Sequence, residues 1–516
     1  MKVPFARNSF AEKAVLHPVG GVGFLDCKGF RNAPVWAKFC LKYGLSLPMH
    51  TRNYHHLIRS WIIGVAAICL GTALSAASPA ENVPLPEEVF PQLKPLLKQA
   101  LSQSSTMLAR NIDIAAAEAN QIMANSARLP YVGASVSYSQ ISSAVSGNVS
   151  TKSKADGVFY SFSASQPVYT WGAVKAAADS AKIGVLIAEK SYADAYRLLA
   201  LSIRGQFMGL VVKKVGLRNA EFAHKLAATN LALEEEKLRN GRLSQGDIIQ
   251  PRLALDEATL ARDRAEQELT QAIRSFCRQA GLAGLEVSQI PDDITLGGQY
   301  YGTSYAEPML AKFIGAGVED TYQAQIYRDY IGQADLTYRI AKVRLYPKFY
   351  LNAAFSQSNQ TTAVPNFISQ VAVDTTTASL TANWNLFDGL ATKGAKLSAL
   401  ATKHTYERIL ENYLSTATQQ ARDLERSLNF SSRAMQLADT RRYLQTSAVQ
   451  MTSQNLARGA STQANVDGAT YALYQSELAA IVARADFLNK WVEFLSALNL
   501  DPVLENLPAK YRTNAK

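Results

Sequence analysis

The sequence predicts a duplicated α+β chain in which long helices alternate with short pairs of β-strands. Apolar residues recur at helical spacing over very long segments, and this spacing changes twice to a two-residue alternation. Each change occurs at a proline, in RLPYVGASVSYSQ (residues 128–140) and in RLYPKFYLNAAFSQS (residues 344–358). Pro130 and Pro347 lie 217 positions apart, which indicates a repeated helix-to-strand unit.

The positive charge of the chain is concentrated near its N-terminus. The 516 residues carry a net charge of +11, and nine Lys/Arg against two Asp/Glu fall within residues 1–77. The remainder holds 44 Lys/Arg against 40 Asp/Glu, with no concentrated basic face along the sequence. We therefore expect no nucleic-acid partner.

A secretory leader is predicted within residues 1–77. The apolar run WIIGVAAICLGTAL (residues 61–74) is too short for an ordinary spanning helix, follows two arginines and is succeeded by small residues. We expect cleavage after Ala77, with an uncleaved anchor as the alternative. The 48 residues before Met49 do not fit a normal leader, so we expect translation to begin at Met49.

Four β-strands are predicted in two pairs, with polar connections at 141–157 and 359–377. In each strand, apolar residues such as Phe162 alternate with small polar residues such as Ser163. Strands of this pattern suit a transmembrane barrel, and a soluble β-sandwich is the alternative. Four strands cannot close a barrel, whereas a trimer would supply twelve. The predicted strands cover about 131–140, 158–168, 348–358 and 378–387.

The longest helical segments run over about 172–240 and 390–458, and neither contains a proline. At 1.5 Å per residue the first would extend roughly 100 Å, which implies coiled-coil-like packing. Each is followed by a turn and a second helix, to about residues 280 and 498. A solvent-exposed coiled-coil rod is the alternative.

The duplication sets the predicted boundaries. GRLSQGDIIQ (241–250) matches GASTQANVDG (459–468) at an offset of 218, and PVYTWG (167–172) matches NLFDGL (385–390). We predict an extended proline-rich segment at 78–95, a first repeat at 96–282, an irregular connection at 283–307, a second repeat at 308–500 and a C-terminal tail at 501–516. Shorter helices at 96–129 and 308–345 open the two repeats.

Over about residues 95–500 the chain resembles the TolC-like family of outer-membrane channel proteins. The resemblance rests on the doubled helix–strand–strand–helix–helix order, on QPVY and NLFDG after the strands, and on the GRLSQGD and GASTQAN turns. It implies a homotrimer with one twelve-stranded β-barrel in outer-membrane lipid and an α-barrel in the periplasm. It also implies a periplasmic adaptor (membrane fusion protein) and an inner-membrane transporter as partners. The helix-to-barrel junctions would lie at Pro130, Pro167, Pro347 and Asn385.

In the family, the helix-hairpin tips form the periplasmic entrance and the adaptor-docking surface. The matching tips here lie at about 239–247 and 457–467. We expect Gly241 and Gly459 to adopt positive φ at the turns, and Ser244 and Thr462 to cap the helices that follow. The predicted tip residues are Arg239, Gly241, Arg242, Ser244, Gln245, Asp247, Arg458, Gly459, Ser461, Thr462, Asn465 and Asp467.

Asp247 matches the family's gate acid. Its usual basic partner would fall at Ser461, which cannot form an ion pair, so Arg458 and Arg242 are the candidate substitutes. The family's pore-ringing acids would fall at Asn465 and Gly468. We therefore expect that ring to be weakened or moved to Asp467, and cation selectivity does not follow from the resemblance.

No catalytic, cofactor or metal site is predicted, and we expect no enzyme. His224 and His404 lie singly on long helices, and the glutamates at 234–236 are typical of a solvated helix face. The resemblance implies a passive export duct of a tripartite efflux or secretion system. A type I protein-secretion outlet is the alternative, and a periplasmic coiled-coil scaffold or adaptor is a third possibility. An adaptor should show one hairpin with flanking β-domains.

Overall fold

A computed structural model describes residues 83–145, 151–296, 303–364 and 367–511 of the chain. The chain divides into two units, Met1–Ala76 and Ala77–Lys516, and every described residue belongs to the second. The predicted leader, its cleavage after Ala77 and the start at Met49 lie outside the described residues. Among the described residues, no helix is long and apolar enough to cross a membrane.

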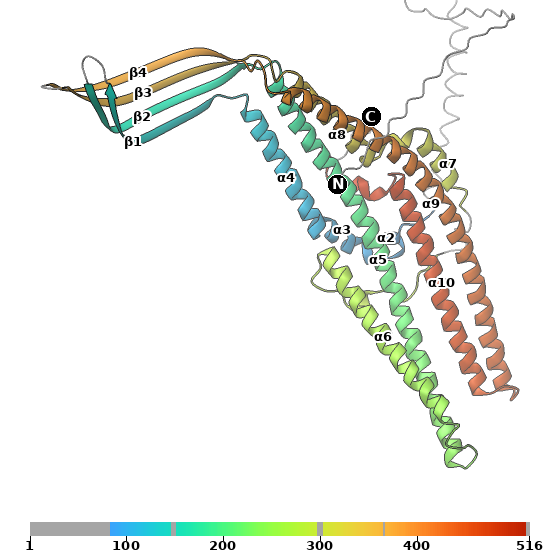
Figure 1. Cartoon of the computed structure of the whole chain (residues 1–516). Coiled ribbons are helices and arrows are strands. Elements are labelled where there is room, and N and C mark those ends of the chain that lie inside the picture. Colours follow the sequence, from blue (N-terminus) through green and yellow to red (C-terminus); the bar gives the residue numbers. More distant parts are fainter. Residues whose placement is uncertain (1–82, 146–150, 297–302, 365–366, 512–516) are drawn as a thin grey trace, which may run out of the picture. The chain divides into compact units, whose positions relative to one another are not determined.

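Helices and one antiparallel sheet make up the second unit, and its second half repeats the element order of the first (Figure 1). The elements are α2 (Pro86–Val89), α3 (Leu93–Gln103), α4 (Ser105–Ser126), β1 (Tyr131–Val145), β2 (Thr151–Tyr169), α5 (Ala173–Arg239), α6 (Ile249–Ala280), α7 (Ala306–Lys312), α8 (Tyr322–Lys342), β3 (Lys348–Val364), β4 (Phe367–Asn383), α9 (Ala391–Ala457) and α10 (Gln463–Ala497). Single-turn segments lie at Val287–Gln289, Phe313–Gly317, Val318–Asp320, Pro502–Asn506 and Ala509–Tyr511.

The two strand pairs join into one sheet with the order β1-β2-β3-β4. The join is the antiparallel pairing of β2 with β3, which sets Phe162 opposite Phe355. Because paired residues share a face, the register gathers the apolar residues of both pairs on one side. This apolar face carries Val132, Val136, Tyr138, Val158, Tyr160, Phe162, Leu351, Phe355 and Leu380.

The opposite face of the sheet is polar and hydrogen-bonded across the strands. Ser135 and Ser161 place their hydroxyl oxygens 2.7 Å apart. The Ser165 hydroxyl donates to Asn352 Oδ1 at 2.7 Å, and Asn352 Nδ2 donates to Thr381 Oγ1 at 2.7 Å. The alternation predicted from the sequence therefore produces one apolar face and one polar face.

The strands are longer than predicted. The connections expected at 141–157 and 359–377 are largely strand, because β1 pairs with β2 out to Val145 and Thr151, and β3 pairs with β4 out to Val364 and Phe367. Ser and Thr side chains do not oppose strand formation when the backbone finds a ladder partner. The last predicted strand ends at Asn383 rather than at residue 387.

The long helices form as predicted. Helices α5 and α9 each contain 67 residues, and both start after a residue in the left-handed region, Gly172 at φ 79° and Leu390 at φ 70°. The shorter helices each break where one continuous helix was expected. The breaks lie at Ser104 and Thr321, again 217 positions apart, and both side chains accept a hydrogen bond from a backbone N–H three residues on.

The segment predicted to be extended, 78–95, instead contains α2 and the start of α3 in its described part. Pro86 and Pro95 both fall within the first turn of a helix, where the amide that proline lacks would have no intrahelical partner. A proline-rich composition is therefore compatible with helix here, and the prediction is wrong over these residues.

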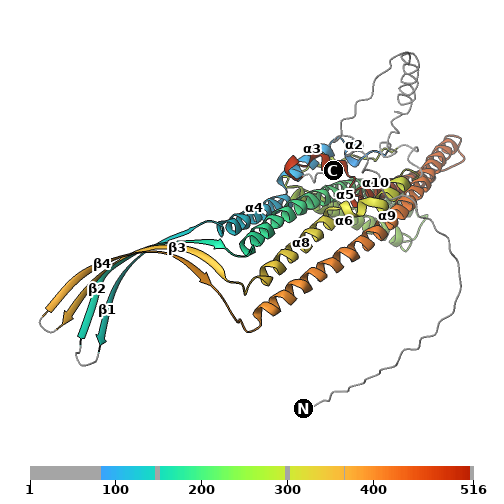
Figure 2. The same ribbon diagram turned by 90° about the horizontal axis from the view of Figure 1, so that it is seen from above.

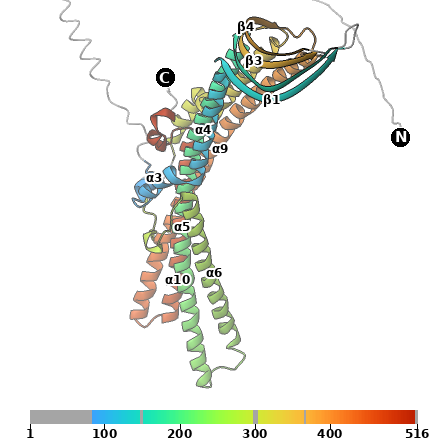
Figure 3. The same ribbon diagram turned by 90° about the vertical axis from the view of Figure 1, so that its left-hand side faces the viewer.

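Helix α5 packs against α4, α6, α8 and α10, and α9 packs against α8 and α10. The sheet continues from the ends of α4, α5, α8 and α9 and curves as it leaves them (Figures 2 and 3). The α5–α6 and α9–α10 hairpin tips lie at the other end of the helices. Buried aromatic residues such as Phe207 and Trp491 fill the helical core between these two ends.

Candidate functional site

The first hairpin tip is a tight turn between α5 and α6. Gly241 has φ 69°, which confirms the predicted positive φ. Asp247 Oδ2 accepts hydrogen bonds from the Ser244 backbone N–H at 2.8 Å and from the Ser244 hydroxyl at 2.7 Å. Ser244 therefore braces the turn and does not cap α6, whose N-cap is Ile248. These two hydrogen bonds stabilise the carboxylate and lower the pKa of the exposed Asp247.

The second hairpin tip, between α9 and α10, matches its sequence prediction more closely. Gly459 has φ 73°, and the Thr462 hydroxyl accepts from the Asn465 N–H at 3.4 Å, so Thr462 caps α10 as predicted. Asn465 also donates to the Ser461 hydroxyl at 3.3 Å. Asp467 accepts from Gln463 Nε2 at 2.8 Å, one helical turn away. Both tips thus hold polar side chains at the end of the hairpins.

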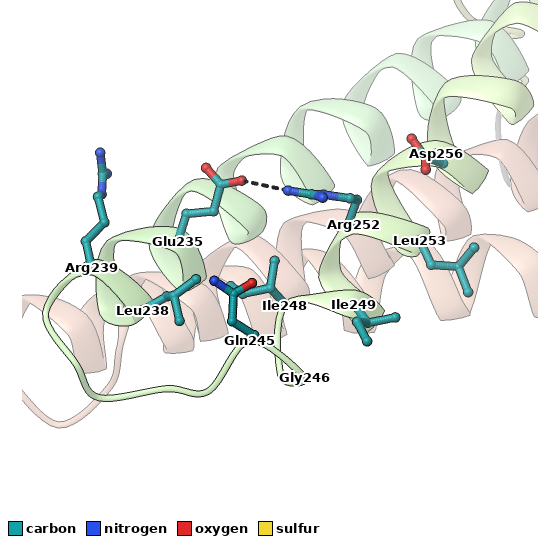
Figure 4. Close-up of a pocket in the computed structure, with 10 residues that line it drawn as sticks. All are labelled: Glu235, Leu238, Arg239, Gln245, Gly246, Ile248, Ile249, Arg252, Leu253 and Asp256. Carbon is teal, nitrogen blue, oxygen red and sulfur yellow. Dashed lines mark ion pairs between the residues drawn. The ribbon is translucent and has the colours of Figure 1, made fainter.

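A groove of about 830 Å³ lies between α5 and α6 just behind the first tip (Figure 4). Glu235 and Arg252 face each other across it with 3.8 Å between their charged atoms, whereas Arg239 points away from them. Ile249 and Leu253 line the groove and remain 63% and 47% exposed. The groove therefore offers an uncovered apolar surface with a charged rim.

The predicted substitutes for the gate's basic partner do not meet Asp247 within the described part of one chain. The carboxylate of Asp247 is bonded only to Ser244 there, and Arg242 and Arg458 are exposed. An ion pair between tips would have to come from a neighbouring copy.

Above the tips, α5 and α10 are joined by contacts that the sequence did not single out. Arg218 Nη2 lies 3.2 Å from Glu477 Oε2, and Asn219 Nδ2 donates to the Tyr474 backbone carbonyl at 2.8 Å. Phe222 packs edge-on against the Tyr474 ring, with centroids 4.7 Å apart. We call Arg218, Asn219, Tyr474 and Glu477 the inter-hairpin clasp. The residues belong to different repeats, so no local pattern reveals their contact.

The helix-to-strand junctions are held by tryptophan N–H groups. Trp171 Nε1 donates to the Pro347 carbonyl at 2.7 Å, and Trp384 Nε1 donates to the Leu345 carbonyl at 3.0 Å. The first hydrogen bond joins the segment that follows β2 to Pro347, the predicted junction residue just before β3. Pro130 and Asn385 lie just outside the strands, whereas Pro167 lies within β2, which continues to Tyr169.

The described residues contain no group of three or more His, Cys, Asp or Glu side chains that could hold a metal ion. His404 lies 2.8 Å from Glu407 on the exposed side of α9. Cys277 is buried, and this burial raises the pKa of its thiol.

Solved structures of outer-membrane channels match the fold of this chain. The Campylobacter jejuni CmeC outer membrane channel matches with a TM-score of 0.63 and 14% identity over 82% of this chain and 91% of that one. The Vibrio cholerae outer membrane protein VceC matches with a TM-score of 0.58 and 16% identity, over 80% of this chain and 97% of that one. The open state of the Neisseria gonorrhoeae MtrE outer membrane channel matches with a TM-score of 0.54 and 16% identity, over 79% of this chain and 89% of that one. No curated relative matches by sequence.

Residues 96–281 match the family model described as outer membrane efflux protein. This match covers most of the first predicted repeat, and it agrees with the resemblance to the TolC-like family on which the sequence prediction rests. The solved structures confirm the predicted fold class.

Proposed function

We propose that three copies of this chain form an outer-membrane export duct. The observation that carries the proposal is the sheet, in which β1 and β4 each pair on one side only within the described residues. An open sheet edge leaves backbone N–H and C=O groups without partners, which lipid cannot supply. Edge-to-edge pairing of β1 with β4 of the next copy satisfies these groups, and three copies close a barrel of twelve strands.

The two faces of the sheet set the orientation of the proposed barrel. The apolar face, with Phe162 and Leu380, meets lipid, where charged groups are costly. The hydrogen-bonded Ser165, Asn352 and Thr381 line a wet lumen. Trp171 and Trp384 at the junctions lie at the membrane–water boundary, where tryptophan is favoured.

The hairpin tips form the periplasmic entrance and dock a periplasmic adaptor. The exposed Ile249 and Leu253 in the α5–α6 groove, with Glu235 and Arg252 at its rim, supply the kind of surface that a partner helix covers. The duct conducts passively, and an inner-membrane transporter supplies the energy. The name of the matching family model supports an efflux role, and a type I protein-secretion outlet is the alternative. Two matched hairpins on one sheet speak against a periplasmic scaffold or adaptor.

Membrane fractionation tests the duct. We expect the protein in the outer-membrane fraction, running as a trimer on unheated gels and as a monomer after boiling, with single-channel conductance in planar bilayers. A soluble monomer would contradict the proposal. Deletion strains then separate the two cargo classes, since loss of efflux raises drug accumulation while loss of type I secretion removes proteins from the medium.

Site-specific crosslinking tests docking. A cysteine placed at Arg242 or Arg458 should capture the adaptor, and mass spectrometry identifies it together with the co-purified pump. The matched control is a cysteine at Arg433, which is exposed on α9 away from the tips. Equal capture from Arg433 would argue against docking at the tips.

A further inference from the structure

The helix ends that adjoin the sheet are more basic than the rest of residues 78–516, which together carry 44 Lys/Arg against 40 Asp/Glu. The four stretches that adjoin the sheet, 127–130, 171–182, 335–348 and 384–403, hold ten Lys/Arg against three Asp/Glu. The sequence conceals this concentration because the stretches are far apart along the chain. The fold brings them to the end of the helices where the sheet begins (Figure 2).

One groove at this end lies between α5 and α8 and has a volume of about 520 Å³. Its lining includes three cations, Lys175, Arg339 and Lys342, all of them exposed. Arg339 also pairs with Asp335 at 2.9 Å. The groove's one acid, Asp179, lies 3.7 Å from Arg128, so its charge is offset from outside the groove. The groove therefore presents an excess of positive charge to an incoming ligand.

An aromatic path joins this groove to the apolar face of the sheet. A β-bulge between Pro167 and Tyr169 sets Tyr169 opposite Phe349, with ring centroids 6.5 Å apart. The Tyr169 ring lies 4.9 Å from the Trp171 ring, and the Trp171 ring lies 5.1 Å from the Tyr346 ring, measured between centroids. Trp171 and Tyr346 themselves line the groove. A ligand with a negative head and long apolar tails would match both surfaces at once.

We propose that the groove binds the phosphate headgroup of an acidic glycerophospholipid in the periplasmic leaflet. Lys175, Arg339 and Lys342 attract the phosphate, Trp171 and Tyr346 lie at the glycerol level, and the acyl chains cover the apolar face above Phe349. The proposal rests on the membrane orientation of the proposed duct. A water-soluble anion without acyl chains would contact the cations but leave the apolar face of the sheet uncovered.

Native mass spectrometry of the full chain in nanodiscs of equimolar phosphatidylglycerol and phosphatidylethanolamine tests this site. Wild type should retain phosphatidylglycerol in excess over phosphatidylethanolamine. A triple variant, Lys175→Gln, Arg339→Gln and Lys342→Gln, should lose this preference by roughly tenfold or more, since each basic residue at an anionic surface contributes about fivefold.

The matched control removes three exposed cations from the tip halves of the helices, as Lys225→Gln, Arg433→Gln and Arg441→Gln. It should retain the lipid preference of the wild type. Wild-type preference in the groove variant, or equal losses in both variants, would overturn the proposal. The trimer band and the single-channel conductance of the same protein report on the proposed duct. A trimer that conducts but shows no lipid preference would contradict the lipid site alone, whereas loss of the trimer band would contradict the duct.

Discussion

The guanidinium of Arg218 lies 3.2 Å from the carboxylate of Glu477, and this ion pair joins the first hairpin to the second. Arg218 also stands over the Tyr474 ring, 5.6 Å from its centroid. Both partners of the ion pair are partly exposed, at 42% and 30%. Separation of the α5 and α10 helices breaks these contacts, so the clasp should favour a closed entrance.

We expect Arg218→Gln to loosen the entrance and to raise single-channel conductance. The ion pair is partly exposed, so its loss should cost only about 0.5–1 kcal/mol per chain, with little change in melting temperature. Arg264→Gln is the matched control, because it removes an exposed ion pair to Glu268 within α6. Reversal of both clasp charges, Arg218→Glu with Glu477→Arg, should restore the low conductance, and failure to restore it would count against the clasp.

Asp247→Ala should also loosen the closed entrance and raise conductance in bilayers. Ser244→Ala keeps the carboxylate but removes one of its two donors, so its effect should be smaller. Equal effects in the two variants would assign Asp247 to the turn alone, and unchanged conductance in Asp247→Ala would contradict its role at the entrance.

The pKa of Asp247 lies below its usual 3.8 because Ser244 donates to the carboxylate. For a carboxyl group with a lowered pKa, the stabilising contribution is present above the unfolded value and is lost as pH falls through the folded value. Wild-type conductance should therefore hold from neutral pH down to pH 3.8 and rise only below it. A rise at pH 5 would assign the transition to another group.

Lysine on the apolar face of the sheet should prevent assembly in the membrane. Phe162→Lys places a charge against lipid, at a cost of roughly 2–4 kcal/mol per chain near the bilayer centre. Ser163→Lys, one residue further along β2, places the same charge on the polar face and should retain the heat-sensitive trimer. Loss of the trimer in both variants, or in neither, would contradict the assignment of the faces.

Arg204→Met should destabilise the protein strongly. Arg204 is fully buried and pairs with Asp501 at 2.6 Å and with Glu87, which ties α5 to both ends of the described chain. Removal of Arg204 leaves the buried carboxylate of Asp501 and the half-buried carboxylate of Glu87 without their cation, at a cost of roughly 3–5 kcal/mol, which should lower the melting temperature.

Two further variants separate this burial effect from a simple loss of charge. Arg328→Met removes an exposed ion pair to Glu319 and should leave the melting temperature within a degree or two of wild type. Addition of Glu87→Gln and Asp501→Asn to Arg204→Met should recover part of the stability. A small effect of Arg204→Met alone would show that the cluster is dispensable.

Periodicity alone was sufficient for the long helices and for the alternation of the strands, because both are set by which residues of a short window are apolar. It failed at the helix breaks. Ser104 and Thr321 each cap the following helix through a single side-chain hydrogen bond. A lone Ser or Thr inside an apolar pattern does not by itself predict a helix break. Ser244 shows the converse, since it has the cap signature but braces a turn.

The sequence by itself determined the duplicated helix–strand order, the two faces of the strands and the turns at Gly241 and Gly459. These features depend on residues close along the chain. Only the tertiary structure decided that β2 pairs with β3, that Arg218 meets Glu477, and that Lys175 and Arg339 line one groove with Trp171. Each of these joins residues from different repeats, and such contacts depend on how whole helices and strands pack rather than on any local pattern.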